Sequence, residues 1–307
     1  MDMSELVDPF ARMIEDICPP EAIRAIESGG PIEAMWGAFV ESGFLDALVS
    51  EDAGGAGLSL AQAAPLIEAL GARAVPLPVG ETMVARALLA AAGQAVPDGP
   101  IALATGAGAV PFAGVAAHVL TGSPEEPVVV VPQATATGVF RDIDGYVPAV
   151  DGAALRPLAA VIRALQISGA AGRVLEMTVA FANERVQFGK PIGKQQAVQQ
   201  QLAVLAEQAV AARIAAAIGA RAGLHPGLIA AAMAKHGASL AAAEIAAIAH
   251  AVHGAIGISE EYDLQFLTRR LHAWRLADGS EGYWAGLLGA ERLAEPEMST
   301  ADFIRAA

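Results

Sequence analysis

The stretch ERVQFGKPIGKQQAVQQQ, residues 184–201, decides how this chain is interpreted. Helical patterns run into it and out of it, and between them lie an arginine, a phenylalanine, a Gly-Lys-Pro-Ile-Gly break and five glutamines in seven residues. In one interpretation Gly189 and Pro191 simply end one helix before the next begins. In the other, Arg185 and Phe188 serve a ligand, because a helix start offers free N–H groups to an anion and arginine offers a planar fork to phosphate.

Composition limits the class of protein. The 307 residues are 54% hydrophobic but only 5% aromatic, which favours closely packed helices over sandwiches or barrels. The formal net charge of −14 argues against a nucleic-acid partner, which needs basic surfaces. A single cysteine, Cys18, excludes an internal disulfide and a multi-cysteine metal site, and burial is expected for it rather than reactivity.

The chain shows no signal-peptide pattern at its N-terminus. Its most apolar stretch, 227–258, fits a buried helix better than a membrane span, because five polar side chains interrupt it: Lys235, His236, Glu244, His250 and His253. The two last histidines are three apart, but no third ligand is evident, so no metal site is expected. These patterns predict a cytoplasmic protein without membrane insertion.

Three zones of different pattern follow one another. Residues 1–96 carry apolar side chains at helical spacing, as in LAQAAPLIEAL at 60–70. Residues 97–157 hold β-branched runs, such as VVVV at 128–131, with frequent Gly and Pro. Helical patterns return over 158–307. We predict a mainly α fold with an N-terminal helical domain, a shortened β-rich middle domain and a C-terminal helical bundle.

The C-terminal zone predicts long helices. One runs from about 158 to Arg185, and another starts at His225-Pro226 and ends at Gly254, with proline in the first turn, where its missing N–H costs nothing. Two more are expected at roughly 259–276 and 280–294.

Two further segments are unusual. HAVHGAIGIS, 250–259, ends a long helix between two glycines, which either cap the helix or let the backbone approach a ligand closely. TRRLHAWRLADGSEGYW, 268–284, gathers basic residues ahead of Asp278-Gly279-Ser280. That tripeptide is either a turn with a helix-capping serine or a turn that presents a carboxylate to a pocket.

Taken together, the three segments resemble the acyl-CoA dehydrogenase family. The first matches its R-x-x-F-G-(K)-P-(I/L)-x-x-x-Q pattern, the second is similar to its Q-x-x-G-G-x-G pattern, and the third lies where the family often carries a Glu-Gly-Thr/Ser turn. The segment 49–82 also resembles the family's Gly-Gly-x-Gly turn and the helix after it. The resemblance spans nearly the whole chain.

This resemblance implies an N-terminal helical domain, a middle β-domain and a C-terminal four-helix bundle, in subunits that share FAD at a dimer interface. By the family pattern, Arg185 would contact the pyrophosphate, Ser280 would lie near the adenosine side, and the other cofactor-binding residues would be Phe188, Ile192, Gln195, Gln196, Ala251, Gly254 and Ala255.

The resemblance also implies a reaction. A carboxylate, here Asp278, would remove the proton beside the thioester carbonyl of an acyl-CoA while the adjacent carbon gives hydride to flavin. The product would be a 2,3-enoyl-CoA, and the electrons would leave through an electron-transfer flavoprotein-type acceptor.

Several departures from the family pattern bear on that reaction. Asp278 replaces the family's glutamate, which retracts the carboxylate by about 1.3 Å, and a misplacement of about 1 Å can cost about a hundredfold in rate. Residues 158–166, where some members carry the base, contain no acid. The middle zone lacks the segment that holds the flavin ring. Alanine stands at 251 and 255, where the family has glutamine and glycine.

Three hypotheses stay open. The surfaces implied to touch a neighbour's FAD match the family better than those of the chain's own catalytic pocket. This asymmetry resembles a subunit of the heteromeric α2β2 acyl-CoA dehydrogenases of bacterial steroid side-chain degradation, completed by a homologous partner subunit. The second hypothesis is a homo-oligomeric dehydrogenase with Asp278 as base. The third is a helical assembly protein that has lost FAD.

Overall fold

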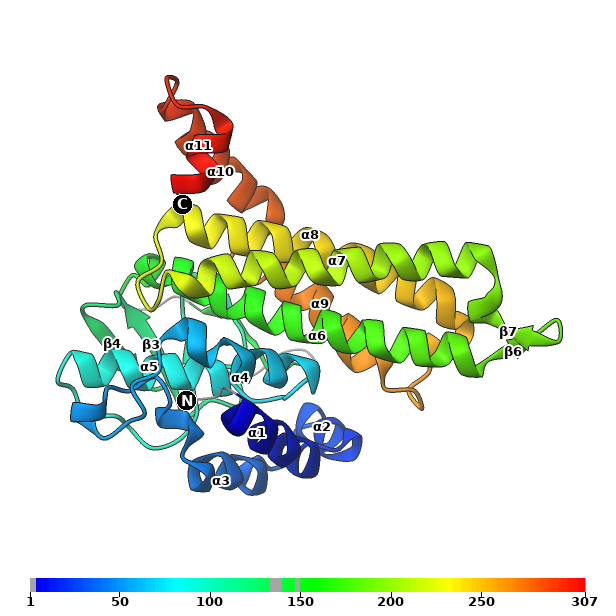
Figure 1. Ribbon diagram of the computed structural model, residues 1–307. Coiled ribbons are helices and arrows are strands. Elements are labelled where there is room, and N and C mark those ends of the chain that lie inside the picture. Colours follow the sequence, from blue (N-terminus) through cyan, green and yellow to red (C-terminus); the bar gives the residue numbers. More distant parts are fainter. Residues whose placement is uncertain (1–3, 133–139, 147–149, 307) are drawn as a thin grey trace.

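Helices make up most of the chain (Figure 1). The computed structural model describes residues 4–132, 140–146 and 150–306. Five helices precede the strands: α1 (Ser4–Ile17), α2 (Pro20–Glu27), α3 (Glu33–Ser42), α4 (Leu60–Ala72) and α5 (Val79–Ala91). The start of α4 is fixed by a capping box, in which the Ser59 hydroxyl accepts a hydrogen bond from the Gln62 N–H and the Gln62 side chain accepts one from the Ser59 N–H.

In the described part of the chain, five short strands follow α5 and form two small sheets. They are β1 (Ile101–Leu103), β2 (Gly108–Val110), β3 (His118–Gly122), β4 (Pro127–Val130) and β5 (Ile143–Tyr146). In the first sheet β3 pairs parallel with β1 and antiparallel with β4, and in the second β2 pairs antiparallel with β5. The predicted strand at 128–131 corresponds to β4.

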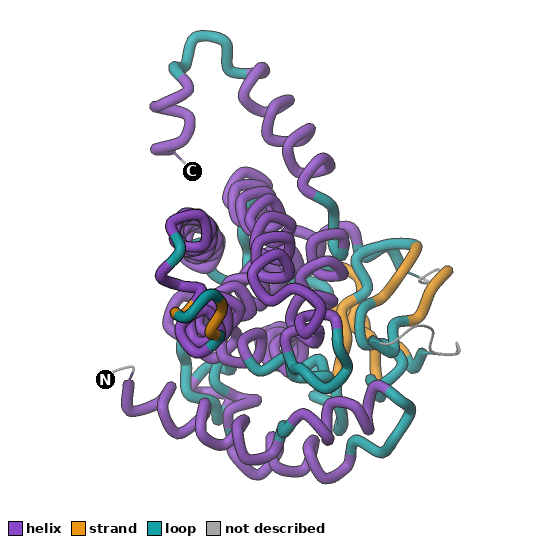
Figure 2. The backbone as a smooth tube through the Cα atoms, turned by 90° about the vertical axis from the view of Figure 1, so that its right-hand side faces the viewer, coloured by secondary structure: helices purple, strands orange, loops and turns teal. Residues whose placement is uncertain are grey.

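The C-terminal part is a bundle of four helices: α6 (Arg156–Glu184), α7 (Gln196–Arg221), α8 (Leu228–His253) and α9 (Leu264–Leu276). Figure 2 views α6, α7 and α8 nearly end-on. Small residues let the helices approach closely. A Cβ added at Gly219 of α7 would lie 2.7 Å from the Cβ of Ala234 on α8, and one at Gly169 of α6 would lie 1.8 Å from the Glu68 carbonyl oxygen on α4.

Two features project from the bundle (Figure 1). Between α6 and α7, β6 (Val186–Gln187) and β7 (Lys190–Pro191) form a small hairpin, followed by the 3-10 turn η4 (Ile192–Lys194). Elsewhere on the bundle, α10 (Glu281–Ala294) starts packed against α8, with Trp284 buried, and then leads outward to α11 (Thr300–Ala306).

The mainly α fold is confirmed, and the long predicted helices match α6, α8, α9 and α10. The prediction of a helix from about 259 placed its start too early, because the 3-10 turn η5 (Gly254–Ile258) and a turn at Ser259–Tyr262 precede α9. The division into three domains remains a prediction. One continuous apolar core includes residues from all three predicted zones, for example Leu66, Leu120 and Val174.

Three stretches are long and apolar enough to span a membrane when length and composition alone are considered: Ala153–Glu184, Gln196–Arg221 and Leu228–Ile258. In this fold, the buried share of the most apolar 18 residues is 78% for the first stretch, 33% for the second and 50% for the third. Of these three helices, α7 therefore leaves the largest part of its apolar surface uncovered.

Candidate functional site

A pocket of about 570 Å³ lies at the end of the bundle where α6, the β6–β7 hairpin and α8 meet. It joins the two segments singled out in the sequence, 184–201 and 250–259. We call it the hairpin-end pocket. It is lined by Phe181, Arg185, Gln187, Ile192 and the six residues from Ala251 to Ile256. Five of the predicted cofactor-binding residues are thus brought together: Arg185, Ile192, Ala251, Gly254 and Ala255.

The hairpin positions Arg185 and Ile192 on the pocket wall. Arg185 ends α6 in an extended conformation, and the Ile192 N–H donates a hydrogen bond of 2.8 Å to its carbonyl. The turn between β6 and β7 needs two positive φ angles, 52° at Phe188 and 78° at Gly189. Glycine adopts such an angle freely, whereas a bulky aromatic residue there is unusual.

Gly254 shapes the opposite wall. Its φ and ψ of 63° and −143° lie in a region that essentially only glycine occupies, and this bend turns the chain from α8 into η5. No described atom lies within 4 Å of where its Cβ would be, so the pocket side of this residue is open. The predicted close approach of backbone to a ligand has room here.

An aromatic stack lies under the pocket. The rings of Phe181 and His253 are 4.4 Å apart, and that of Tyr262 is 5.2 Å from His253. His253 Nδ1 lies 2.8 Å from the Ala249 carbonyl oxygen, so Nδ1 carries the proton and donates it. Burial lowers the pKa of His253. Phe181 and His253 were not predicted as pocket residues. Their apolar spacing on α6 and α8 is typical of core positions.

The other predicted cofactor residues lie outside this pocket. Phe188 sits at the hairpin tip with 92% of its surface exposed. Gln195 precedes α7 and Gln196 begins it. Ser280 is at the N-terminus of α10, where its hydroxyl accepts a hydrogen bond from the Tyr283 N–H. Their roles in cofactor binding remain predictions.

Asp278 belongs to a second, largely buried group of polar side chains. Arg163 of α6 is 3.3 Å from Asp278 through its Nε and Oδ2, and 3.1 Å from Glu81 of α5 through Nη2 and Oε1. Arg163 Nη1 donates to Gln166 Oε1 at 2.7 Å, and Gln166 donates to Glu81. Thr105 donates to Asp278 Oδ1 at 3.2 Å. We call these five residues the Arg163 network.

The charged side chains of the Arg163 network are almost completely buried. The side chains of Arg163 and Glu81 are each 3% exposed, and that of Asp278 is 4% exposed. Burial raises the pKa of Glu81, and the Arg163 charge opposes that rise. Because both Asp278 oxygens are occupied, by Thr105 and Arg163, its carboxylate is not presented to any pocket described here.

The turn that carries Asp278 is itself held from two sides. Asp278 has a positive φ of 57°, and the Trp284 Nε1–H donates to its carbonyl at 3.1 Å. The fully buried Lys235 of α8 donates to the carbonyl oxygens of Arg275 and Gly279 at 2.9 and 2.8 Å. Burial lowers the pKa of Lys235 to about 7. The sequence pattern gave no sign of Arg163, Glu81 or Lys235 as members of a polar cluster.

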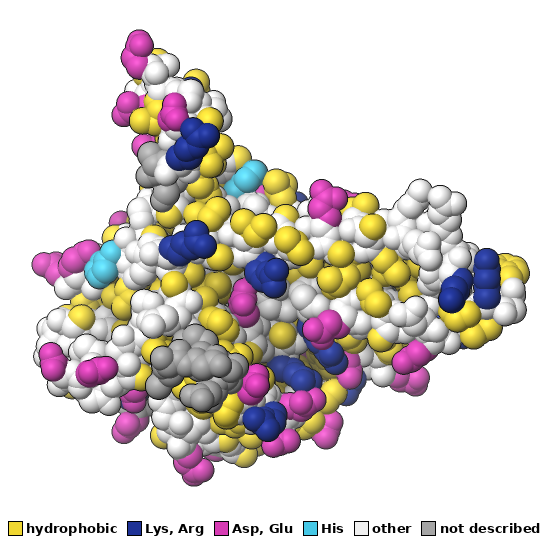
Figure 3. Space-filling model, viewed as in Figure 1, with side chains coloured by type: hydrophobic (Ala, Val, Ile, Leu, Met, Phe, Trp, Pro, Cys, Tyr) yellow, Lys and Arg dark blue, Asp and Glu magenta, His cyan; other side chains and the backbone are white. Residues whose placement is uncertain are grey.

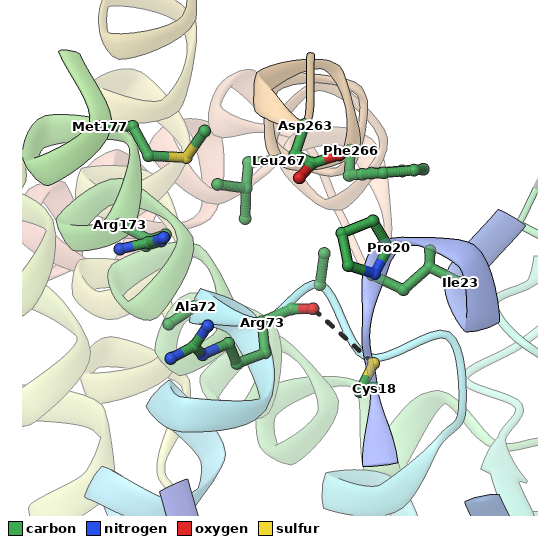
Figure 4. A pocket seen from close by; sticks show the side chains of 11 residues that line it. Cys18, Pro20, Ile23, Ala72, Arg73, Arg173, Met177, Asp263, Phe266 and Leu267 are labelled. Carbon is green, nitrogen blue, oxygen red and sulfur yellow. Dashed lines mark hydrogen bonds between the residues drawn. The ribbon is translucent and has the colours of Figure 1, made fainter. Parts of the chain in front are cut away.

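A smaller pocket, of about 100 Å³, lies between α2, α4, α6 and α9 (Figure 4). Cys18 and Arg73 are on one side, and Met177 and Phe266 are on the other. The Cys18 thiol is 3.9 Å from the Arg73 carbonyl oxygen, and burial raises the pKa of Cys18 to about 12. As predicted, this cysteine is buried, and its high pKa makes it unreactive.

Comparison with known sequences places these sites in a family. The pattern of the family described as "Acyl-CoA dehydrogenase, C-terminal domain" matches residues 158–293. The chain is 32% identical over 286 residues to acyl-CoA dehydrogenase IpdE2 of Mycolicibacterium smegmatis, covering 87% of this chain and 91% of that protein.

Two solved structures share the fold. The Tcur3481-Tcur3483 steroid ACAD variant superposes with a TM-score of 0.79 and 25% identity, over 97% of this chain and 99% of that chain. The ChsE4-ChsE5 complex from Mycobacterium tuberculosis gives a TM-score of 0.76 and 22% identity, over 95% of this chain and 97% of that chain.

Proposed function

Because the chain belongs to the acyl-CoA dehydrogenase family, whose members are FAD-dependent oxidoreductases, we propose that it is one subunit of a heteromeric enzyme. In this proposal it binds the adenosine diphosphate end of an FAD, and a homologous partner subunit supplies the catalytic carboxylate. Two relatives support a partner: the name of the Tcur3481-Tcur3483 steroid ACAD joins two components, and ChsE4-ChsE5 is a complex.

The hairpin-end pocket fits the diphosphate part of FAD. Arg185 supplies a guanidinium at its wall, which suits phosphate oxygens, and Gly254 leaves open space for close approach. Phe181 and Ile192 add apolar surface. Ala251 lacks the side-chain amide of the family's glutamine, and Ala255 lacks the exposed backbone of the family's glycine. Arg185 is therefore expected to contribute most to recognition of the diphosphate.

The region of this chain where the family pattern would place the flavin ring does not fit the ring as well as the hairpin-end pocket fits the diphosphate. By the family pattern the reacting carboxylate lies at the turn before α10, and in this chain the Arg163 network fills that place. Asp278 is paired with Arg163 and hydrogen-bonded by Thr105, with 4% of its side chain exposed. This is the observation that carries the proposal, since a general base must come within hydrogen-bond reach of the proton that it removes, and both oxygens of this buried carboxylate already have partners.

The two sites are also far apart. Arg163 and Arg185 lie 22 residues apart in sequence, and their positions along the α6 axis are about 33 Å apart at 1.5 Å per residue. A cofactor whose diphosphate meets Arg185 is therefore not expected to place its ring at this chain's own Asp278, which lies beside Arg163. Its ring is expected to meet the partner subunit.

In this division of roles the residues of this chain bind and orient. FAD, when bound, accepts the hydride from the acyl-CoA. Arg185 holds the diphosphate, the Phe181–His253 stack keeps the pocket wall rigid, and the Phe188 hairpin contacts the neighbour. Proton removal falls to a carboxylate of the partner. The substrate class we propose is the CoA thioester of a steroid side chain, as the steroid ACAD relative suggests, with electrons passing to an electron-transfer flavoprotein-type acceptor.

The test is flavin retention. The chain is purified alone and after co-expression with a homologous, full-length acyl-CoA dehydrogenase subunit, and flavin is quantified after denaturation. We expect colourless protein alone and yellow protein from co-expression. Stoichiometric FAD in the chain alone would favour the homo-oligomer with Asp278 as base. Colourless protein in both preparations would favour an assembly protein without FAD.

A further inference from the structure

The smaller pocket between α2, α4, α6 and α9 has an apolar interior. We call it the Cys18 pocket, and its volume is about 100 Å³. Ile23, Phe266 and Leu267 line it and are only 4%, 2% and 4% exposed. Met177 of α6 and Cys18 lie on opposite sides of it (Figure 4). This interior suits the hydrocarbon part of a small ligand.

Two arginines stand at the rim of the Cys18 pocket. Arg73 is the C-cap of α4 and Arg173 lies on α6, and in Figure 4 both guanidinium groups lie on the side of the pocket away from Pro20. Figure 3 shows basic side chains, with acidic ones around them, where α6 meets α1 and α2. The side chains of the two arginines are 32% and 38% exposed, so their charges face solvent as well as the pocket.

The ion pairs of these two arginines leave room for a further anion. Arg73 Nη2 is 2.9 Å from Glu15 Oε1, and Arg173 Nη1 is 3.2 Å from its neighbour on α6, Glu176 Oε2. The two glutamate side chains are 59% and 69% exposed, and exposed pairs of this kind contribute little to stability. Because each guanidinium has five N–H groups, both can also donate to a carboxylate at the rim.

A third charged group on the rim is Asp263, just before α9. Its Oδ1 is 3.1 Å from Arg24 Nη2, so its charge is compensated by a side chain of α2. Two guanidinium groups beside one compensated carboxylate make the rim favourable for an anion. A cationic ligand would be repelled there, whereas a carboxylate would find N–H donors from two helices.

A strained residue forms part of the wall. Ala74 follows α4 with a φ of 52° and is 2% exposed. Its N–H donates to the Gly71 carbonyl at 3.0 Å, and the Val75 N–H donates to the Leu70 carbonyl at 3.1 Å, in a helix ending that commonly takes glycine. Glycine would relieve this conformation but would remove a methyl group from the pocket wall. Strained residues of this kind cluster at ligand sites.

The size of the pocket limits the ligand. An apolar cavity of about 150 Å³ in another protein holds benzene, so a pocket of about 100 Å³ holds about four carbons. A nucleotide or a steroid group is too large for it. We propose that the Cys18 pocket binds a short unbranched carboxylate of about four carbons. The hydrocarbon lies between Met177, Phe266 and Leu267, and the carboxylate lies at Arg73 and Arg173.

The Cys18 pocket is separate from the site that the proposed function uses. None of the described residues lines both this pocket and the hairpin-end pocket, although Met177 and Phe181 lie four residues apart on α6. The chain binds the carboxylate alone and without flavin. Measuring this binding therefore does not depend on whether the proposed function is right.

Methionine-methyl NMR of the isolated chain tests the proposal. Sodium butyrate is the probe, and butylamine and 1-butanol are matched ligands with a positive charge and with no charge. The Met177 signal, assigned with Met177→Leu, reports on the pocket itself. Arg73→Gln and Arg173→Gln remove one rim charge each, with Arg221→Gln at the exposed end of α7 as the matched control. Ala72→Phe fills the pocket, and melting temperatures check that every variant folds.

We expect butyrate to shift the Met177 signal saturably, with a dissociation constant in the millimolar range. Each rim variant should weaken binding about fivefold, and Arg221→Gln should bind like wild type. Butylamine and butanol should bind at least about tenfold more weakly than butyrate. Ala72→Phe should abolish the saturable shift of the methionine signal.

The absence of a saturable shift at about 50 mM butyrate would overturn the proposal. So would unchanged affinity in both rim variants, or butanol that binds as tightly as butyrate. Saturable binding in a folded Ala72→Phe chain would show that the ligand lies elsewhere, and if that variant does not fold, the rim variants decide. Loss of flavin from the co-expressed complex would count against the proposed function alone, because butyrate binding is measured on the isolated chain.

Discussion

Arg163 and Asp278 are 115 residues apart in the chain, yet their side chains form an ion pair of 3.3 Å in which both partners are almost completely buried. The pair joins α6 to the turn between α9 and α10, and Arg163 extends it to Glu81 on α5. One guanidinium thus balances two carboxylates taken from distant segments. Such a group costs desolvation energy to bury, and removing one partner leaves charge without compensation.

Replacing Arg163 with leucine should therefore lower the stability of the folded protein strongly. We expect a loss of about 3–5 kcal/mol in the free energy of unfolding, because the Asp278 and Glu81 carboxylates stay buried without their partner. Urea denaturation measures it. Arg173→Leu is the control, since that arginine is 38% exposed and pairs with the neighbouring Glu176, and a change of about 0–1 kcal/mol is expected for it. Equal losses in the two variants would contradict the role of the network.

Asp278→Asn tests whether the Asp278 carboxylate has a structural or a catalytic role. The asparagine keeps the shape of the side chain but weakens the contact with Arg163, so stability should fall. In the flavin-loaded complex, turnover should stay within about threefold of wild type, because loss of a general base usually costs about 10²–10⁴-fold. A loss of that size with FAD content unchanged would identify Asp278 as the base.

Lys235 should make stability depend on pH. Its pKa is lowered to about 7 in the fold, against an ordinary value of 10.5. Between these two values the unfolded chain binds a proton that the folded chain has released, so this group makes the folded state more stable as pH rises. The stability of wild type relative to Lys235→Met should increase by about 1.4 kcal/mol per pH unit in that window. A flat difference from pH 7 upwards would show that Lys235 stays charged.

Two glycines of α6 provide a matched pair for packing. At Gly169 a Cβ would lie 1.8 Å from the Glu68 carbonyl oxygen of α4, whereas a Cβ at Gly172 would have no described atom within 4 Å beyond the neighbouring backbone of its own helix. Gly169→Ala should force α4 away from α6 and cost about 3 kcal/mol. Gly172→Ala should stabilise the helix by about 0.5–1 kcal/mol. Thermal unfolding compares the two, and a similar effect of both substitutions would argue against close contact between α4 and α6.

Arg185→Ala tests the hairpin-end pocket. A hydrogen bond to a charged group is worth about 1.5–3 kcal/mol, so FAD should bind about 10- to 150-fold more weakly to the complex. Flavin released by stepwise dilution measures this affinity. Arg221→Ala, at the far end of α7, removes an exposed arginine outside the pocket. If both variants hold FAD like wild type, the diphosphate is bound elsewhere.

Most of the fold could be predicted from local patterns. The spacing of apolar residues predicted the helices, and glycine and proline predicted their ends. Both kinds of signal depend only on residues that are close together in the sequence. The start of α9 was placed too early, at about 259, because the turn at Ser259–Tyr262 contains no glycine or proline that would mark it as separate from the helix.

The candidate site was only partly visible in the sequence. Arg185 and Gly254 could be found because each stands in a polar or glycine-rich break. Arg163 could not, because it lies inside the apolar helix α6 and its partners Glu81 and Asp278 come from other parts of the chain. Nothing local shows that one buried arginine will meet two buried acids, and the ion pair exists only through tertiary packing.

The distance along α6 from Arg163 to Arg185 has a consequence for stoichiometry. Each copy of this chain offers one pocket wall for the diphosphate of an FAD. Its own ring position is filled by the Arg163 network, so it offers no second place for a flavin. An assembly of two copies with two partner subunits is therefore expected to hold two flavins among four polypeptides. Its flavin absorbance per unit of protein mass would be half that of an enzyme in which every chain has an open ring site.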